Sequence, residues 1–293
     1  MSLLSLLAKI KVYVASIIVS ISYVQVHTNN NTLQDALLKK PQTIFVHGTL
    51  FPIISSLVGY IACPRGLHPL LSRPNKYILP ALGYTLAKAA PDMFPATNFY
   101  LFGWNGLLSF NQRYEAAEKL YQALKNAHYG PITLIGHSHG CNVILNLAAV
   151  AKRHNDENFK IERIILLAPP VQTVTQAYSF SSIFKKIYVL YSAGDWIQIA
   201  DPQGLYQMSC YYHKTEKKTP FFSGRIFDAR PHILQARILF GKNDLWHIDF
   251  IGRRFVHALP NILHLMDKLN NNHAVKHSCI SISGTGKPCA LSK

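Results

Sequence analysis

Short apolar runs that alternate with helical patterns constrain this chain of 293 residues more than any other feature. Five runs are rich in β-branched or aromatic residues and end in turn residues: TIFVHG (43–48), FYLFGW (99–104), ITLIGH (132–137), RIILLAP (163–169) and IYVLYSAGD (187–195). Continuous apolar strands are typical of a parallel sheet that is buried on both faces. Helical spacing lies between them at 112–127 and 141–154. The pattern predicts an α/β fold with a mostly parallel sheet and helices on both faces.

A further strand (234–240) and a closing helix (248–269) complete the expected domain, residues 32–269. Residues 50–98 are rich in Leu, Ile, Tyr, Phe and Pro, and so long a connection between strands is usually a lid or binding loop. We therefore expect an apolar cap insertion there. A second long connection spans 199–230, and the polar residues 270–293 are expected to form a flexible tail.

Residues 1–31 hold a hydrophobic segment in which Lys9 and Lys11 precede an apolar run at 12–26. This run fits the apolar region of a signal peptide but is shorter than the ~20 residues that cross a bilayer. Three interpretations stay open: an uncleaved signal anchor, a cleaved signal peptide, and a packed or membrane-surface helix. The first two predict a membrane-associated or exported protein with its globular part outside. The third leaves a cytoplasmic location open.

The net charge is +16, from 30 Lys and Arg against 14 Asp and Glu, and it favours anionic surfaces such as phospholipid headgroups or nucleic acid. The basic residues are scattered, without a zinc-finger, RNP-like or basic-helix pattern, so nucleic-acid binding is not expected. Five cysteines at wide spacings include no C-x-x-C pair that would indicate zinc or a dithiol. Cys279 and Cys289 are open to either a disulfide or two reduced thiols.

The sequence GHSHG (136–140) places Ser138 between an apolar strand and a helix, with a glycine two positions away on each side. This context is typical of a nucleophile elbow, where the serine occupies a strained turn and only glycines let neighbouring backbone approach. The alternative is a serine that caps the helix. A metal site at His137 and His139 is excluded because histidines two apart around a tight turn point to different sides. We expect no metal and no cofactor.

With HGT (47–49) after the first strand, an aspartate after a later strand and a histidine after the last, the chain resembles the α/β-hydrolase superfamily, in particular its lipases and esterases. The resemblance covers 43–269 in organisation. It implies the chain order Ser, acid, His. It also implies that Ser138 Oγ attacks an acyl carbonyl while a histidine takes its proton.

The favoured histidine is His247 in NDLWHIDFI, directly after the last strand and at the start of a helical run. Three others compete. His257 and His264 lie inside the closing helix, which favours a packed or surface role. His232 precedes the last strand, which places it at the wrong end of the sheet.

The favoured acid is Asp195, at a carboxyl strand end from which a carboxylate can orient the imidazole. Asp201 and Asp228 are the alternatives. The separation between Asp195 and His247 is longer than is usual in the family. By resemblance, the oxyanion donors are the backbone N–H groups of Thr49 and His139; the alternative for HGT is a simple strand-ending turn.

The loop GWNGLLSF (103–110) near the expected mouth carries Trp104 and Asn105 as candidate substrate-binding residues, with a capped helix start as the alternative. An apolar cap over the carboxyl ends of the strands favours an acyl chain as ligand. Together with the charge, it favours a membrane-associated enzyme that meets lipid esters.

The sequence therefore predicts a serine hydrolase that cleaves carboxylic esters of the lipase or esterase type. Thioesterase or amidase activity on the same triad stays open. So does a non-catalytic, membrane-attached binding protein of the same fold.

Overall fold

The computed structural model describes residues 41–49, 63–126, 130–200, 223–271 and 277–291. The chain divides into two compact units, Met1–Lys40 and Pro41–Lys293, and everything below concerns the second. The hydrophobic segment expected at 1–31 lies outside the described residues. Among the described residues, no helix combines the length and apolar character that spanning a bilayer requires.

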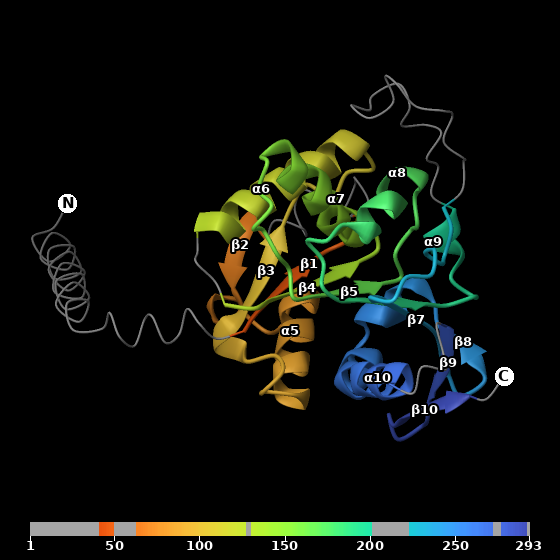
Figure 1. Ribbon diagram of the computed structural model, residues 1–293. Coiled ribbons are helices and arrows are strands. Elements are labelled where there is room, and N and C mark those ends of the chain that lie inside the picture. The colour runs from red at the N-terminus through yellow and green to blue at the C-terminus, as the bar shows by residue number, and fades with distance from the viewer. Residues whose placement is uncertain (1–40, 50–62, 127–129, 201–222, 272–276, 292–293) are drawn as a thin grey trace, which may run out of the picture. The chain divides into compact units, whose positions relative to one another are not determined.

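A single mixed sheet forms the centre of the second unit (Figure 1). Its strands are β1 (Gln42–Val46), β2 (Gly66–Pro69), β3 (Phe99–Gly103), β4 (Ile132–His137), β5 (Arg163–Leu167), β6 (Ile187–Tyr191), β7 (Ile233–Phe240), β8 (Asn243–Asp244), β9 (His277–Ile282) and β10 (Pro288–Leu291). Their order is β10-β9-β7-β6-β5-β4-β1-β3-β2, with β8 paired to β7. The seven neighbouring strands β9, β7, β6, β5, β4, β1 and β3 pair in parallel. Strands β2, β8 and β10 each pair antiparallel with a neighbour. The predicted parallel sheet is thus confirmed.

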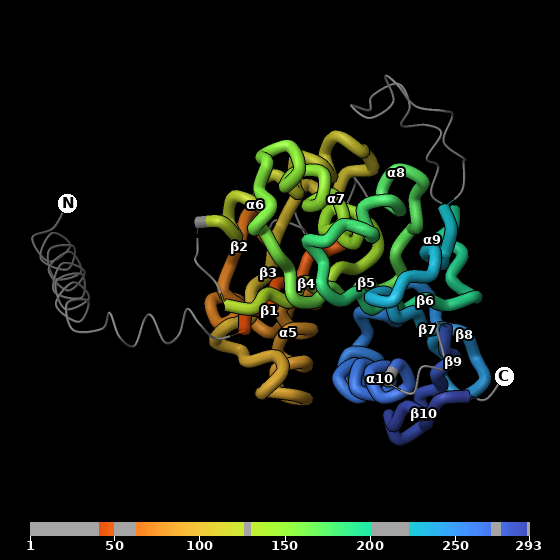
Figure 2. The backbone as a smooth tube through the Cα atoms, in the orientation of Figure 1, coloured from red at the N-terminus to blue at the C-terminus, as the bar shows by residue number. Residues whose placement is uncertain are grey.

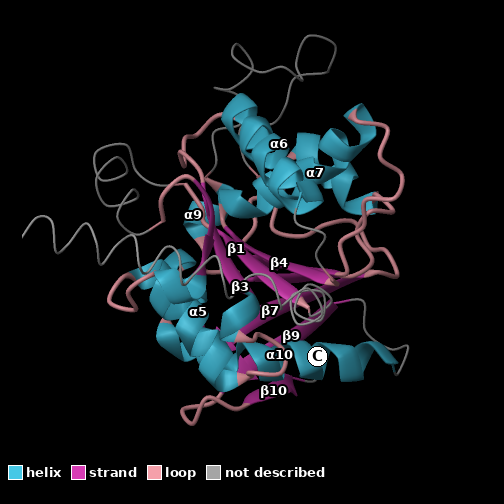
Figure 3. Ribbon diagram, turned by 90° about the vertical axis from the view of Figure 1, so that its left-hand side faces the viewer, coloured by secondary structure: helices cyan, strands magenta, loops and turns pink. Residues whose placement is uncertain are grey.

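Helices cover both faces of the sheet, as Figure 3 shows. The pair α6 (Phe110–Asn126) and α7 (His139–Arg153) packs on one face, and the pair α5 (Ile78–Ala89) and α10 (Arg253–Asn271) packs on the other. Short helical segments connect the strands: η3 (Leu70–Ser72), η4 (Ala96–Asn98), α8 (Thr173–Gln176), η5 (Ala177–Phe180), α9 (Trp196–Ile199) and η8 (His247–Ile251).

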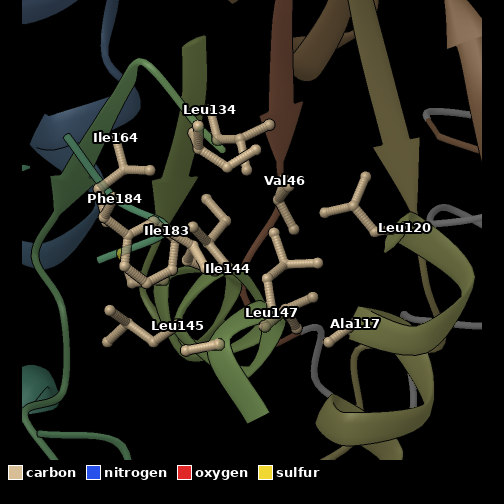
Figure 4. Packing of buried hydrophobic residues seen from close by; sticks show 14 of the residues in the cluster. Val46, Ala117, Leu120, Leu134, Ile144, Leu145, Leu147, Ile164, Ile183 and Phe184 are labelled. Atoms are coloured by element: carbon tan, nitrogen blue, oxygen red, sulfur yellow. The ribbon is translucent and has the colours of Figure 1, made fainter. Parts of the chain in front are cut away.

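Two hydrophobic clusters hold these layers together, one on each face. Val46, Leu134 and Ile164 face α7, where Ile144 and Leu147 meet them (Figure 4). Their strand neighbours Phe45, Ile135 and Ile165 belong to the cluster under α10. Successive residues of a strand point to opposite faces, so strands buried on both faces must be apolar throughout.

The described part of the expected cap insertion, residues 63–98, forms an edge strand of the sheet and a helix packed on one of its faces instead of a cap. Strand β2 pairs with β3 at the edge of the sheet, and α5 buries Leu79, Leu82 and Leu86 beside α10. The apolar residues of this interval therefore complete the sheet and one of its helical layers. Residues 50–62 lie outside the description.

The flexible tail expected at 270–293 also differs from the structure. Strand β9 continues the parallel sheet beyond β7, and β10 folds back on β9 next to α10 (Figure 2). Ile280 and Ile282 are fully buried, which anchors the hairpin despite its polar composition. Cys279 and Cys289 are both free thiols here, because Cys279 lies opposite Leu291 and Cys289 opposite Ser281.

Candidate active site

Ser138 lies at the sharp turn between β4 and α7. Its backbone has φ 53° and ψ −130°, a strained conformation for a residue with a side chain, and its N–H donates to Leu167 O at 2.9 Å. Its side chain makes no capping hydrogen bond within the described part of the chain, so the helix-cap interpretation is not supported. The strand, turn and helix expected of a nucleophile elbow are all present.

The two glycines of GHSHG are required by close backbone contacts. A Cβ on Gly136 would lie 2.8 Å from the Cys141 nitrogen, and one on Gly140 would lie 2.3 Å from Val46 O. A third glycine, Gly48, approaches the serine itself, since its Cβ would lie 2.7 Å from Ser138 Cβ. This contact fixes the HGT loop against the turn that carries Ser138.

Asp195 and His247 meet as the sequence predicts. His247 Nδ1 lies 2.7 Å from Asp195 Oδ2, and both side chains are buried. Asp195 follows β6 and caps α9, where its Oδ1 accepts a hydrogen bond from Gln198 N at 3.0 Å. His247 follows β7, the strand next to β6, and its short antiparallel partner β8, and it opens η8. A buried carboxylate on Nδ1–H holds the ring with Nε2 as its basic nitrogen.

The competing residues lie elsewhere. His257 and His264 are exposed on α10, and His232 precedes β7 with its Nε2 2.9 Å from Ser179 O. Asp228 is exposed, and Asp201 lies outside the described residues.

His137 links the elbow to His247. Its Nε2–H donates to His247 O at 3.0 Å, and the two rings lie 4.8 Å apart between centroids. Burial lowers the pKa of His137 to about 3. The neutral His137 ring therefore holds the His247 backbone close to the turn that carries Ser138.

His47 supports the HGT loop in a similar way. Its Nδ1–H donates to Gly48 O at 2.7 Å, and its Nε2 accepts from Trp104 N at 3.2 Å. Burial lowers the pKa of His47 to about 4, so the ring is neutral at pH 7. Thr49, the next residue after Gly48, has a buried hydroxyl without a hydrogen-bond partner in the described part of the structure.

Trp104 does not line an open surface, contrary to its expected substrate-binding position. The side chain is 6% exposed, its ring stacks on His47, and its Nε1–H donates to His47 O at 2.8 Å. Asn105 donates to Gln112 in the first turn of α6 and accepts from Leu107 N at 3.1 Å, whereas the helix start is capped by Ser109, whose Oγ accepts from Gln112 N at 3.4 Å. Both residues therefore stabilise the loops around the site through hydrogen bonds.

The sequence did not point to Arg225, whose hydrogen bonds hold the loop that carries Asp195. Its Nε donates to Ser192 O at 3.0 Å and its terminal nitrogen to Asp195 O at 2.9 Å. Arg225 lies 30 positions beyond Asp195 in a long connection of no regular pattern. No local signal points to it.

Asp244 was also missed, although it lies three positions before His247. It accepts from Arg237 Nε at 3.0 Å and from the terminal nitrogen at 2.8 Å, and also from Ser192 Oγ and Ala193 N, each at 3.3 Å. Hydrogen bonding to the Arg237 guanidinium lowers the pKa of Asp244, which stays ionised. Asp244 thus joins the acid-bearing loop to the strand that leads to His247.

No protein-family model and no curated protein matches the sequence. Among solved structures, a hyperthermophilic esterase from the archaeon Pyrobaculum calidifontis is 10% identical, with a TM-score of 0.35 over 84% of this chain and 68% of that one. An alpha-beta serine hydrolase homologue from Coxiella burnetii is 16% identical, with a TM-score of 0.35 over 80% of this chain and 85% of that one. Carboxyl esterase 2 from the fungus Tuber melanosporum is 9% identical, with a TM-score of 0.37 over 85% and 69%.

Because these identities and TM-scores are low, the fold is assigned on the sheet and the elbow described above. The parallel strand order, the strained Ser138 between β4 and α7, and the buried Asp195–His247 pair give this chain the α/β-hydrolase fold.

Proposed function

We propose that the protein is a serine hydrolase that cleaves carboxylic esters through an acyl-enzyme on Ser138. The observation that carries the proposal is the conjunction of a serine in a strained elbow with a buried His247–Asp195 hydrogen bond of 2.7 Å. A strained backbone at a serine is costly, and such strain persists mainly where function requires it.

In the proposed reaction, Ser138 Oγ attacks the ester carbonyl while His247 Nε2 takes its proton. Asp195 holds Nδ1–H and stabilises the imidazolium that forms. The imidazolium then protonates the leaving alkoxide as the acyl-enzyme forms. A water molecule, deprotonated by the same histidine, attacks the acyl carbon and releases the acid and the serine.

The negative charge on the carbonyl oxygen requires donors that are already in place. We assign the backbone N–H groups of His139, at the start of α7, and Thr49 to this role. The Thr49 hydroxyl supports the assignment, because a buried and unpartnered O–H gains a hydrogen bond when an oxyanion forms beside it.

The proposed substrate is an ester with an apolar acyl group. Thioesters and amides pass through the same acyl-enzyme and are outcomes of the substrate test. We retain membrane association as part of the proposal because the net charge of +16 favours anionic lipid.

A fluorophosphonate probe tests the nucleophile. We expect rapid labelling of the full chain and of Ser182→Ala, an exposed serine, and no labelling of Ser138→Ala. Hydrolysis of p-nitrophenyl esters should fall by about 10⁴ in kcat for Asp195→Asn, because the imidazole then adopts the wrong tautomer. Equal labelling of Ser138→Ala and the wild type would refute the proposal, as would a folded wild type that neither labels nor hydrolyses esters. The latter result would favour a non-catalytic binding protein.

A further inference from the structure

Five large apolar side chains stand exposed beside the Asp195–His247 pair. Their exposed fractions are 67% for Trp196, 55% for Ile197, 49% for Ile226, 63% for Trp246 and 68% for Ile248. We call these five residues the apolar rim. They are half of the ten large hydrophobic residues that are exposed in the described part of the chain. Exposed apolar residues gathered in one place mark an interaction site, whereas scattered ones do not.

The apolar rim is tied closely to the candidate active site. Trp196 follows Asp195 directly, and Trp246 and Ile248 flank His247. Helix α9 packs against η8, which brings the two tryptophan-bearing segments together. Ile226 joins them because its neighbour Arg225 donates to Asp195 O at 2.9 Å.

The backbone under the apolar rim is held by hydrogen bonds rather than by the exposed side chains. Asp195 caps α9, and the Trp246 N–H donates to Asp249 Oδ2 at 2.8 Å. The exposed tryptophans therefore lie on well-anchored turns. Such turns can present apolar side chains to a partner at little cost in conformational entropy.

Positive charge accompanies the apolar rim. Residues 223–254 contain six arginines and lysines against three aspartates, and one of these aspartates, Asp244, is paired with Arg237. The Arg225 guanidinium lies 5.9 Å from the centroid of the Trp196 ring. Lys242 and Arg253 are exposed, whereas Arg230 lies over the Phe180 ring at the amino end of β7, the opposite end of the strand from His247. Tryptophan beside arginine suits the boundary between phospholipid headgroups and acyl chains, where the ring is half-immersed and the cation meets phosphate.

We propose that the apolar rim docks on an anionic phospholipid surface and holds the active site against it. Trp196, Trp246 and the three isoleucines enter the acyl-chain boundary, while Lys242 and Arg253 bind headgroup phosphates. The value of docking for catalysis on lipid esters rests on the proposed function, but the docking itself does not.

The tryptophans make this proposal directly measurable. The chain has three, and Trp104 is buried, so a change in tryptophan emission on vesicles reports on Trp196 and Trp246. The experiment uses the full chain carrying Ser138→Ala, so that no lipid is consumed. Vesicles of phosphatidylcholine, alone or mixed with phosphatidylglycerol, carry bromine on the acyl chains as a contact quencher.

We expect a blue shift and quenching on the anionic vesicles, and little of either on neutral ones. Trp196→Phe with Trp246→Phe should remove the quenching. Ile197→Ser with Ile248→Ser should weaken vesicle binding, measured by the quenching, by about tenfold. The matched control is Leu71→Ser with Ile78→Ser, which alters two equally exposed residues remote from the site and should change nothing.

Absence of quenching on anionic vesicles would overturn the proposal. Quenching that is equal on neutral vesicles would overturn the electrostatic part, and equal loss in the Leu71 and Ile78 control would show that the binding is not specific to the apolar rim. The measurement needs no hydrolysis, so its failure is separate from a failure of the proposed function. Vesicle binding through residues 1–31 alone would leave Ile197→Ser with Ile248→Ser unaffected, which also counts against docking through the apolar rim.

Discussion

The two sides of the candidate active site are built by different means. The elbow side, with Ser138 between β4 and α7, is fixed by backbone contacts that leave no room for a Cβ at Gly48, Gly136 or Gly140. The side that carries Asp195 and His247 is fixed by charged side chains, chiefly Arg225 and the Asp244–Arg237 pair. The serine is thus positioned by steric exclusion and its acid–base partners by directional hydrogen bonds. The two sides should fail differently when they are altered.

The largest effect is expected on the elbow side, from Gly140→Ala. The added methyl would lie 2.3 Å from Val46 O and 2.5 Å from His47 O, and both are backbone atoms that cannot rotate away. We expect a loss of about 3 kcal/mol or more in the free energy of unfolding, by chemical denaturation, together with loss of fluorophosphonate labelling. Gly284→Ala is the control, since nothing lies within 4 Å of its added Cβ. If both variants unfold alike, steric exclusion does not hold the elbow.

On the other side, Asp244→Asn should affect activity more than stability. The variant keeps the shape of the side chain but loses the ion pair with Arg237 that braces the loop from Ser192 to Asp195. We expect kcat for ester hydrolysis to fall by about 10- to 100-fold with KM little changed, because small displacements of catalytic groups are costly. The free energy of unfolding should fall by only about 1 kcal/mol.

The control for that change is Glu162→Gln, which breaks the exposed ion pair with Lys185. It should leave both kcat and stability unchanged. The pH profile of kcat/KM separates positioning from a merely structural role, because only a displaced Asp195–His247 pair moves its acidic limb, where protonation removes the general base. An unchanged kcat with lowered stability would show that Asp244 does not position the Asp195–His247 pair.

The smallest expected effect is a dependence of stability on pH that arises on the elbow side. His47 and His137 have pKa values of about 4 and about 3, lowered mainly by burial, whereas unfolded histidines titrate near 6.5. Between these values the unfolded chain binds more protons than the folded one, so stability rises with pH. It is fully present above about 6.5 and is lost as the pH falls toward 4 and 3. Each histidine contributes a slope of up to about 1.4 kcal/mol per pH unit.

Denaturation at a series of pH values measures this slope. His137→Gln should reduce the slope of stability against pH by up to the contribution of one histidine. His264→Gln, an exposed position on α10, should leave the slope unchanged. The charged side behaves differently, because the pKa of Asp244 is lowered from 3.8, chiefly by its hydrogen bond to Arg237, and its contribution is lost only at lower pH. A slope that His137→Gln leaves unaltered would place the acid sensitivity elsewhere in the molecule.

This contrast explains what the sequence could predict. Five consecutive residues between a strand and a helix encode the elbow, so a local pattern is enough to identify Ser138. Asp195 and His247 were found because strand ends of a parallel sheet meet at one edge. Arg225 and Asp244 act through contacts that span long stretches of chain, and no periodicity encodes such contacts.

The errors have a related cause. Residues 50–98 were expected to form a cap because the connection is long and apolar, but neither property distinguishes a lid from α5, which buries the apolar residues of its part of this interval against the sheet. Trp104 was expected to face the substrate because it follows a strand, yet the acceptors that satisfy its ring and backbone belong to His47. The polar 277–291 segment has only a few apolar residues, and two of them, Ile280 and Ile282, anchor the hairpin.

That hairpin determines what kind of strand precedes His247. With β9 paired along its outer side, β7 is an interior strand. A chain shortened before His277 would keep Ser138, Asp195 and His247, yet it would leave the β7 hydrogen-bonding groups from Gln235 to Phe240 open to other chains. The last fifteen described residues thus keep β7 from being an edge strand while contributing no group to the proposed chemistry.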